Sequence, residues 1–132
     1  MSMRELIADE NSIWIEVLVF VLGGAAYGLI EVVFRGFTHW TMVLTGGACV
    51  LTIYVMLGWL TEMPLLLAAL IGAVIITTYE FSVGYIVNLR LGWNVWDYSA
   101  QPGNLLGQIC PLFMGVWFVL CFLLLGAVRF LS

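Results

Sequence analysis

Charged side chains are scarce in this sequence, and lysine is absent. The 132 residues contain eight acidic residues, four basic residues that are all arginine, and one histidine. A nucleic-acid-binding surface needs clustered positive charge, which four dispersed arginines do not supply. The composition therefore excludes nucleic acid as a partner.

Motifs for catalysis and cofactor binding are also missing. The three cysteines lie inside apolar runs without CxxC or Cys/His spacing, so we interpret them as small core residues. The sequence has no Walker A motif, no HExxH and no GxSxG, and its two GG pairs lie inside apolar segments. We therefore predict no catalytic residue, no metal site and no cofactor. The enzyme question stays open, with a non-enzymatic role favoured over a membrane-embedded enzyme that acts on a lipid.

What the sequence has in abundance is apolar surface. Hydrophobic residues make up 64% of the chain and charged residues 9%, with a mean hydropathy of +1.12. Soluble domains are about 45–50% apolar and about 25% charged. A chain of this size cannot cover so much apolar surface with its few polar groups. The excess must face lipid, which predicts an integral, multi-pass membrane protein.

Four apolar runs approach the roughly 20 residues that a membrane-spanning helix needs. They predict an all-α fold with a single transmembrane domain over residues 1–132 and helices at about 13–34, 40–60, 64–87 and 105–128. Pro64 stands where a helix start tolerates proline, whereas Pro111 is expected to kink or shorten the fourth helix.

The connections predict two antiparallel hairpins. Residues 35–39 and 61–63 are short enough for tight turns between neighbouring helices. The connection at 88–104 is longer than the usual 2–8 residues or so and carries several tryptophan and tyrosine residues. Because these side chains favour the headgroup layer, we expect an ordered interfacial loop there.

The sequence says less about the N-terminal segment and about the orientation of the chain in the membrane. Residues 1–12 form a short acidic segment that lacks the features of a signal peptide. With four spans, the positive-inside comparison sets Arg4 and Arg129 against Arg35 and Arg90. The balance of two against two leaves the orientation open.

Two glutamates within the predicted spans are the main candidates for function. Glu31 shares a helix face with Gly24, Gly28 and Arg35, and Glu80 shares one with small and polar residues. A carboxylate inside a span costs about 2.5–3.5 kcal/mol and normally faces the bundle interior or a water-filled cavity. Either the two acids form a cation or proton site, or they are structural ion pairs with arginines such as Arg35 and Arg90.

Further candidates surround these acids in the sequence. Tyr27 offers an aromatic face for a cation, and His39, at the start of the second helix, can titrate near neutral pH or act as a hydrogen-bond partner. The segment Trp96-Asp97-Tyr98 reads either as a lid over the bundle or as a binding surface. Asn104 suits the N-cap of the fourth helix.

Several short segments resemble one family in the same order along the chain. They are Tyr27-Gly28-Leu29-Ile30-Glu31, Phe37-Thr38-His39-Trp40, Pro64-Leu65-Leu66, Tyr79-Glu80 with Gly84, Trp96-Asp97-Tyr98-Ser99, Asn104-Leu105 and Gly107-Gln108-Ile109-Cys110. From about Tyr27 to Trp117 the chain resembles the small bacterial membrane proteins of the CmpB-like, ABC-transporter permease family. The WDYS…N…G stretch is the most specific part. The matching positions are Glu31, His39, Glu80, Trp96, Asp97, Tyr98, Ser99, Asn104 and Gly107.

The resemblance implies transport in a bacterial cytoplasmic membrane. Since the sequence has no nucleotide-binding motif, an ATP-driven permease would need other transporter subunits. We expect the protein to bind or translocate a small molecule or ion, cationic or amphiphilic, through a polar site built on Glu31 and Glu80. A homo-oligomer is expected because four helices enclose little volume. The alternative is a non-transporting membrane scaffold or a lipid-binding accessory subunit.

Overall fold

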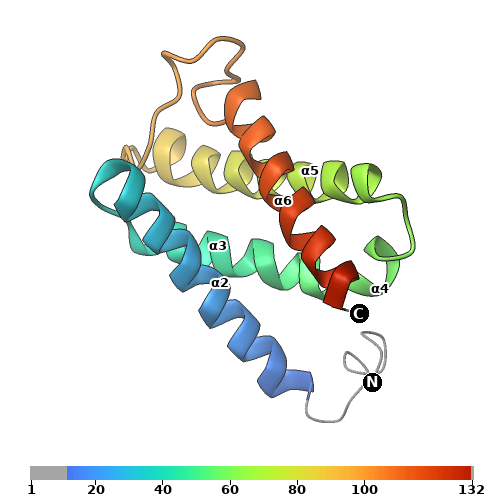
Figure 1. Ribbon diagram of the computed structural model, residues 1–132. Coiled ribbons are helices and arrows are strands. Elements are labelled where there is room, and N and C mark those ends of the chain that lie inside the picture. The colour runs from blue at the N-terminus through green and yellow to red at the C-terminus, as the bar shows by residue number, and fades with distance from the viewer. Residues whose placement is uncertain (1–11, 132) are drawn as a thin grey trace. The chain divides into compact units, whose positions relative to one another are not determined.

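The computed structural model describes residues 12–131, and the acidic segment expected at 1–12 lies outside this range except for Ser12 (Figure 1). The described chain is helical, which confirms the all-α prediction, and its only β feature is an isolated bridge between Leu105 and Ile109. The helices are α2 (Ser12–Arg35), α3 (Trp40–Val55), α4 (Leu57–Leu60), α5 (Leu65–Gly84), the π-helix η1 (Tyr85–Arg90) and α6 (Pro111–Leu131). The chain divides into two compact units between Glu62 and Met63, at the short turn that joins α4 to α5.

The first unit is a hairpin of α2 and α3 whose helices approach closely at glycines. A Cβ atom added to Gly24 would lie 2.6 Å from the Val43 carbonyl oxygen, and one on Gly47 would lie 2.7 Å from the Phe20 carbonyl oxygen. Only glycine allows backbones to come this near. Gly36, with a φ of +83°, reverses the chain between the two helices.

The second helix is shorter than the expected 40–60 span because one tight turn interrupts it. The Met56 amide donates to the carbonyls of Thr52 and Ile53, both at 3.1 Å, and the backbone leaves α-helical geometry there. The one-turn helix α4 follows directly and ends at Leu60. Trp40–Val55 is thus an apolar helix of 16 residues, about 24 Å long, against a hydrocarbon core of about 30 Å.

The second unit is a hairpin of α5 and α6 joined by the long loop at 91–110. α5 begins directly after Pro64 and runs without a break into η1, so this helix reaches Arg90 rather than the expected residue 87. In η1 the Leu91 amide bonds the Ile86 carbonyl at 2.9 Å, which is the wider spacing of a π-turn. At the other end of the unit, the Arg129 guanidinium donates to the Met63 carbonyl and ties the end of α6 to the start of α5.

The fourth helix begins at Pro111, later than the expected residue 105. Proline has no amide hydrogen and disfavours helical geometry in the residue before it, so it fits the first turn of a helix better than its interior. Of the two effects expected of Pro111, the helix is therefore shortened rather than kinked, whereas the prediction that Asn104 caps this helix is wrong. Asn104 lies in the loop, seven positions before Pro111 (111 − 104).

Within residues 12–131, three helices are long and apolar enough to cross a membrane: Ile13–Arg35, Leu65–Arg90 and Pro111–Leu131. Large hydrophobic side chains on their outer faces are exposed, for example Val33 at 75% and Leu123 at 62%. Water would penalise this exposure, whereas lipid accommodates it.

Candidate functional site

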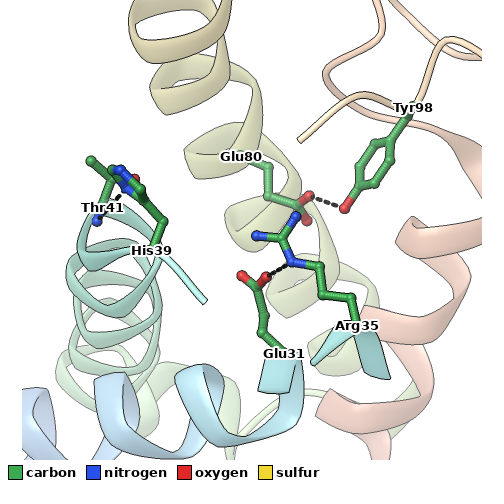
Figure 2. Close-up of polar contacts among 6 residues, drawn as sticks. All are labelled: Glu31, Arg35, His39, Thr41, Glu80 and Tyr98. Carbon is green, nitrogen blue, oxygen red and sulfur yellow. Dashed lines mark hydrogen bonds and ion pairs between the residues drawn. The ribbon is translucent and has the colours of Figure 1, made fainter. Parts of the chain in front are cut away.

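Glu31 lies near the C-terminal end of α2 and pairs with Arg35 one turn later (Figure 2). The distance from Glu31 Oε2 to Arg35 Nε is 2.6 Å, and the two side chains are 14% and 27% exposed. The Arg35 guanidinium also lies 4.4 Å from the centre of the Phe37 ring, a cation–π contact. The i, i+4 spacing of a helix brings the two charges together, as the ion-pair alternative expects.

The second carboxylate oxygen of Glu31 takes no part in the ion pair with Arg35. Glu31 Oε1 and the Thr38 hydroxyl are both buried, and neither has a hydrogen-bond partner within residues 12–131. Gly28, one turn before Glu31, faces this threonine: a Cβ atom there would lie 3.9 Å from Thr38 Oγ1. Buried polar atoms are almost always satisfied, so these two atoms are exceptions among the polar groups of this hairpin.

His39 serves as the N-cap of α3 (Figure 2). Its Nδ1 accepts the Thr41 amide at 3.2 Å and lies 2.6 Å from the Thr41 hydroxyl. Accepting an N–H requires an unprotonated Nδ1. His39 thus acts as a hydrogen-bond partner at a helix end.

Tyr27 lies at the contact between α2 and α3. A Cβ atom on Gly46 would come within 2.3 Å of the Tyr27 Cβ, so the tyrosine occupies the space that this glycine leaves. The residue is half-buried there. Packing against α3 accounts for its position in the first unit.

Glu80 is the most enclosed charged residue of the second unit. It is 2% exposed, and its Oε2 accepts a hydrogen bond from the Tyr98 hydroxyl at 3.2 Å (Figure 2). The Tyr98 ring stacks on Phe113 of α6, with ring centres 4.8 Å apart. Thr77, three residues before Glu80 on α5, has a buried hydroxyl with no partner within the described chain. The Tyr98 hydroxyl thus connects the long loop to the buried Glu80 carboxylate.

A network of amides holds the loop on the second unit. The Asn88 side-chain amide donates to Gln108 Oε1 at 2.8 Å, while its oxygen accepts the Val95 amide at 2.6 Å. The Trp96 indole donates to the Gln108 carbonyl at 3.0 Å. Gln108 and Trp96 are 3% and 7% exposed. The network therefore joins the end of η1 to the inner part of the loop, and we call residues 88–110 together the amide cap.

Gly84 makes room for the amide cap. A Cβ atom there would lie 2.5 Å from Gln108 Oε1 and 2.8 Å from Trp96 Cζ2. Asn88 and Gln108 were not among the predicted site residues, although Asn88 shares a helix face with Glu80 and Gly84. That shared face was the available signal in the sequence.

Asp97 and Asn104 organise the outer turns of the amide cap. Asp97 Oδ1 accepts the Ser99 amide at 2.9 Å, and this bond holds the pKa of the exposed Asp97 carboxyl below its usual value. The Asn104 side chain donates to the carbonyls of Ser99 and Gln101 and accepts the Gly107 amide at 2.9 Å. Both residues close turns of the loop, as short polar side chains often do.

The predicted site residues therefore fall into two groups. Tyr27, Glu31 and His39 belong to the first unit, and Glu80, Trp96, Asp97, Tyr98 and Asn104 belong to the second. Within residues 12–131, no three His, Cys, Asp or Glu side chains gather in a way that could hold a metal ion. The three cysteines are buried and form no disulfide within the described residues.

Long apolar helices with lipid-compatible outer faces and a few enclosed polar groups define an integral membrane protein. Residues 13–131 match the family described as "Putative ABC-transporter type IV". The chain belongs to this family, which confirms the resemblance and makes it a transport-related membrane protein. No curated protein and no solved structure gives a significant match.

Proposed function

We propose that this protein binds or translocates a small molecule or ion, and that Glu31 and Glu80 supply the acidic groups of one polar site. The transporter family and the presence of both carboxylates within apolar helices support this reading. Ionisable residues inside membrane spans commonly mark substrate or ion pathways. The two acids also occupy matching places in their hairpins, each near the C-terminal end of a long helix.

The single observation that carries the proposal is the unsatisfied oxygen of Glu31. Arg35 pairs with one carboxylate oxygen, while the other and the Thr38 hydroxyl have no donor or acceptor within the described chain. A purely structural ion pair in a dry span would have its remaining oxygen satisfied, because orphaned buried acceptors are costly. A cation, a proton or a ligand donor completes this group.

The proposed substrate is cationic or amphiphilic, because the two carboxylates outnumber the one arginine, Arg35, that pairs with Glu31. In the bilayer we propose four crossings, with α3 and α4 together forming the second and the amide cap lying in the headgroup layer. We also propose a homo-oligomer, because a pathway forms more easily between protomers than within four helices. ATP-driven transport would require further subunits, which supply the nucleotide-binding domains.

The test is uptake into proteoliposomes with and without a proton gradient. A panel of small organic cations and monovalent ions is compared for the unaltered protein, Glu31→Gln and Glu80→Gln. We expect each variant to lose at least about tenfold in uptake, the equivalent of about 1.4 kcal/mol, with its helicity retained. Glu62→Gln is the matched control, since Glu62 is an exposed acid beyond the end of α4. Full uptake in both Gln variants would refute the proposed site.

A second candidate is a non-transporting scaffold or lipid-binding accessory subunit. The 2.6 Å ion pair of Glu31 with Arg35 and the bond from Tyr98 to Glu80 favour it, since both also serve as structural ties. Under this alternative, the Gln variants lower the melting temperature and no cation in the panel is taken up. Uptake by the unaltered protein that depends on Glu31 and Glu80 would exclude it.

A further inference from the structure

A second polar feature lies at the opposite end of α2 from Glu31. A shallow groove between α2 and α3 is lined by Ile13, Glu16, Val17, Phe20, Val21 and Leu51. Glu16 and Glu31 are 15 residues apart (31 − 16), which is about 22 Å along a helix. The groove is therefore separate from the site proposed above.

Glu16 is the only charged side chain of this groove. It is half-exposed, and within residues 12–131 it has no hydrogen bond and no ion pair. The rest of the lining is aliphatic or aromatic. A carboxylate this isolated, inside an apolar candidate span, is costly unless something of opposite charge meets it.

Tyr54 is the second, independent feature. It stands one turn after Leu51 on α3, is 9% exposed, and its hydroxyl is buried without a partner in the described part of the chain. Glu16 and Tyr54 are close enough to interact electrostatically, yet no hydrogen bond joins them. The groove thus holds a carboxylate with no ion pair in the described part of the chain, and α3 has an unpartnered phenol one turn beyond the groove residue Leu51, which points to a ligand that carries a positive charge and hydrogen-bond donors.

We propose that this groove binds a single-chain amphiphilic amine. Its ammonium group would pair with the Glu16 carboxylate and donate to the Tyr54 hydroxyl, and its alkyl chain would lie on Val17, Val21 and Leu51. The charge of Glu16 selects a cation over an anion. The apolar lining selects a chain-bearing amine over a small hydrated ion, since apolar contact contributes about 25 cal/mol per Å².

The experiment measures binding of a fluorescent dodecylammonium probe to the full-length protein in phosphatidylcholine nanodiscs, with empty nanodiscs as background. Glu16→Gln is expected to weaken binding about tenfold or more, because it removes a charge pair. Tyr54→Phe is expected to weaken it about two- to tenfold, the range for one hydrogen bond. Glu62→Gln is the charge-matched control and is expected to bind as the unaltered protein does.

The groove itself is tested by filling it. Val17→Trp is expected to weaken the probe's binding, whereas Leu18→Trp places the same indole at a residue outside the lining and is expected to leave binding unchanged. Equal affinity in Glu16→Gln and Glu62→Gln would overturn the proposal. So would dodecanol competing as well as dodecylammonium, or displacement of the probe by added phosphatidylethanolamine, which would make the occupant a resident lipid. None of these outcomes bears on Glu31 or Glu80.

Discussion

Tyr98 donates a hydrogen bond to Glu80 across 18 positions of sequence, at 3.2 Å. This bond connects the amide cap directly to the most enclosed charged residue of the second unit. The same ring stacks on Phe113, so a single residue joins the loop to both long helices of its hairpin. A substitution or protonation of Glu80 therefore alters the hydrogen bond that holds Tyr98 of the amide cap.

Replacing Tyr98 by Phe removes the donor but keeps the ring that stacks on Phe113. We expect a loss of stability of about 1–3 kcal/mol, because a buried carboxylate oxygen loses the hydrogen bond that Tyr98 donates. The melting temperature of the detergent-solubilised protein measures this loss. Tyr85→Phe is the control, since Tyr85 is 41% exposed on η1. Equal melting temperatures for the two variants would show that the Tyr98–Glu80 bond contributes nothing to stability.

Gly84→Ala tests the fit between α5 and the amide cap. The added methyl group would lie 2.5 Å from Gln108 Oε1 and 2.8 Å from Trp96 Cζ2, so one of these side chains must move. We expect a cost of about 1–3 kcal/mol, typical of overpacking. Gly115→Ala on α6 is the control, because a Cβ atom there meets nothing within 4 Å. That substitution should be neutral or stabilising by about 0.5–1 kcal/mol, as in an open helix. Chemical denaturation of both variants measures the difference, and equal stability would contradict the tight fit.

A double-mutant cycle measures the ion pair of α2. Glu31→Gln, Arg35→Gln and the double variant are compared by denaturant unfolding. We expect a coupling free energy of about 0.5–3 kcal/mol, as for residues in direct contact. Strictly additive effects would mean that the 2.6 Å pair does not stabilise the hairpin.

Acid should loosen the outer turn of the amide cap. The Ser99 amide holds the pKa of Asp97 below its ordinary value, which is about 3.9 when unfolded. A carboxyl with a lowered folded pKa stabilises the fold above the unfolded pKa, and this contribution is lost as the pH falls through the folded pKa. The change therefore begins near about pH 4 and grows below it.

Tryptophan fluorescence between about pH 5 and pH 3 follows this change, since Trp96 adjoins Asp97. Asp97→Asn keeps an acceptor oxygen without a titrating group and is expected to give a flat profile in this window. The same acid transition in both proteins would assign it to another group.

Hydropathy alone predicted where most helices lie. The spans at 13–34 and 64–87 were approximated closely because long apolar runs admit few alternatives in lipid. The start of the fourth helix was missed because Leu105 and Leu106 look like helix residues by hydropathy. In the structure Leu106 has a φ of +54° and lies in a turn, while proline geometry sets the helix start at Pro111.

The role of single polar residues was harder to predict. The sequence placed Asn104 at a helix N-cap, but its side chain closes a loop turn by bonding the Gly107 amide. The Glu31–Arg35 pair could be predicted because helical spacing brings the two together. The Asn88–Gln108 pair could not, since its members are 20 positions apart and most of the residues between them belong to an irregular loop.

The sequence by itself determined that this chain is helical, apolar on its outside and marked by two glutamates within long spans. Composition and helical periodicity suffice for that, because lipid requires every backbone polar group to be satisfied within a helix. Only the tertiary structure decided that Tyr98 bonds Glu80, that Gln108 fills the space above Gly84, and that Glu16 shares a groove with Leu51 of α3. Those contacts depend on the path of a loop or on the packing of a second helix. The hydrophobic pattern of the sequence does not predict either.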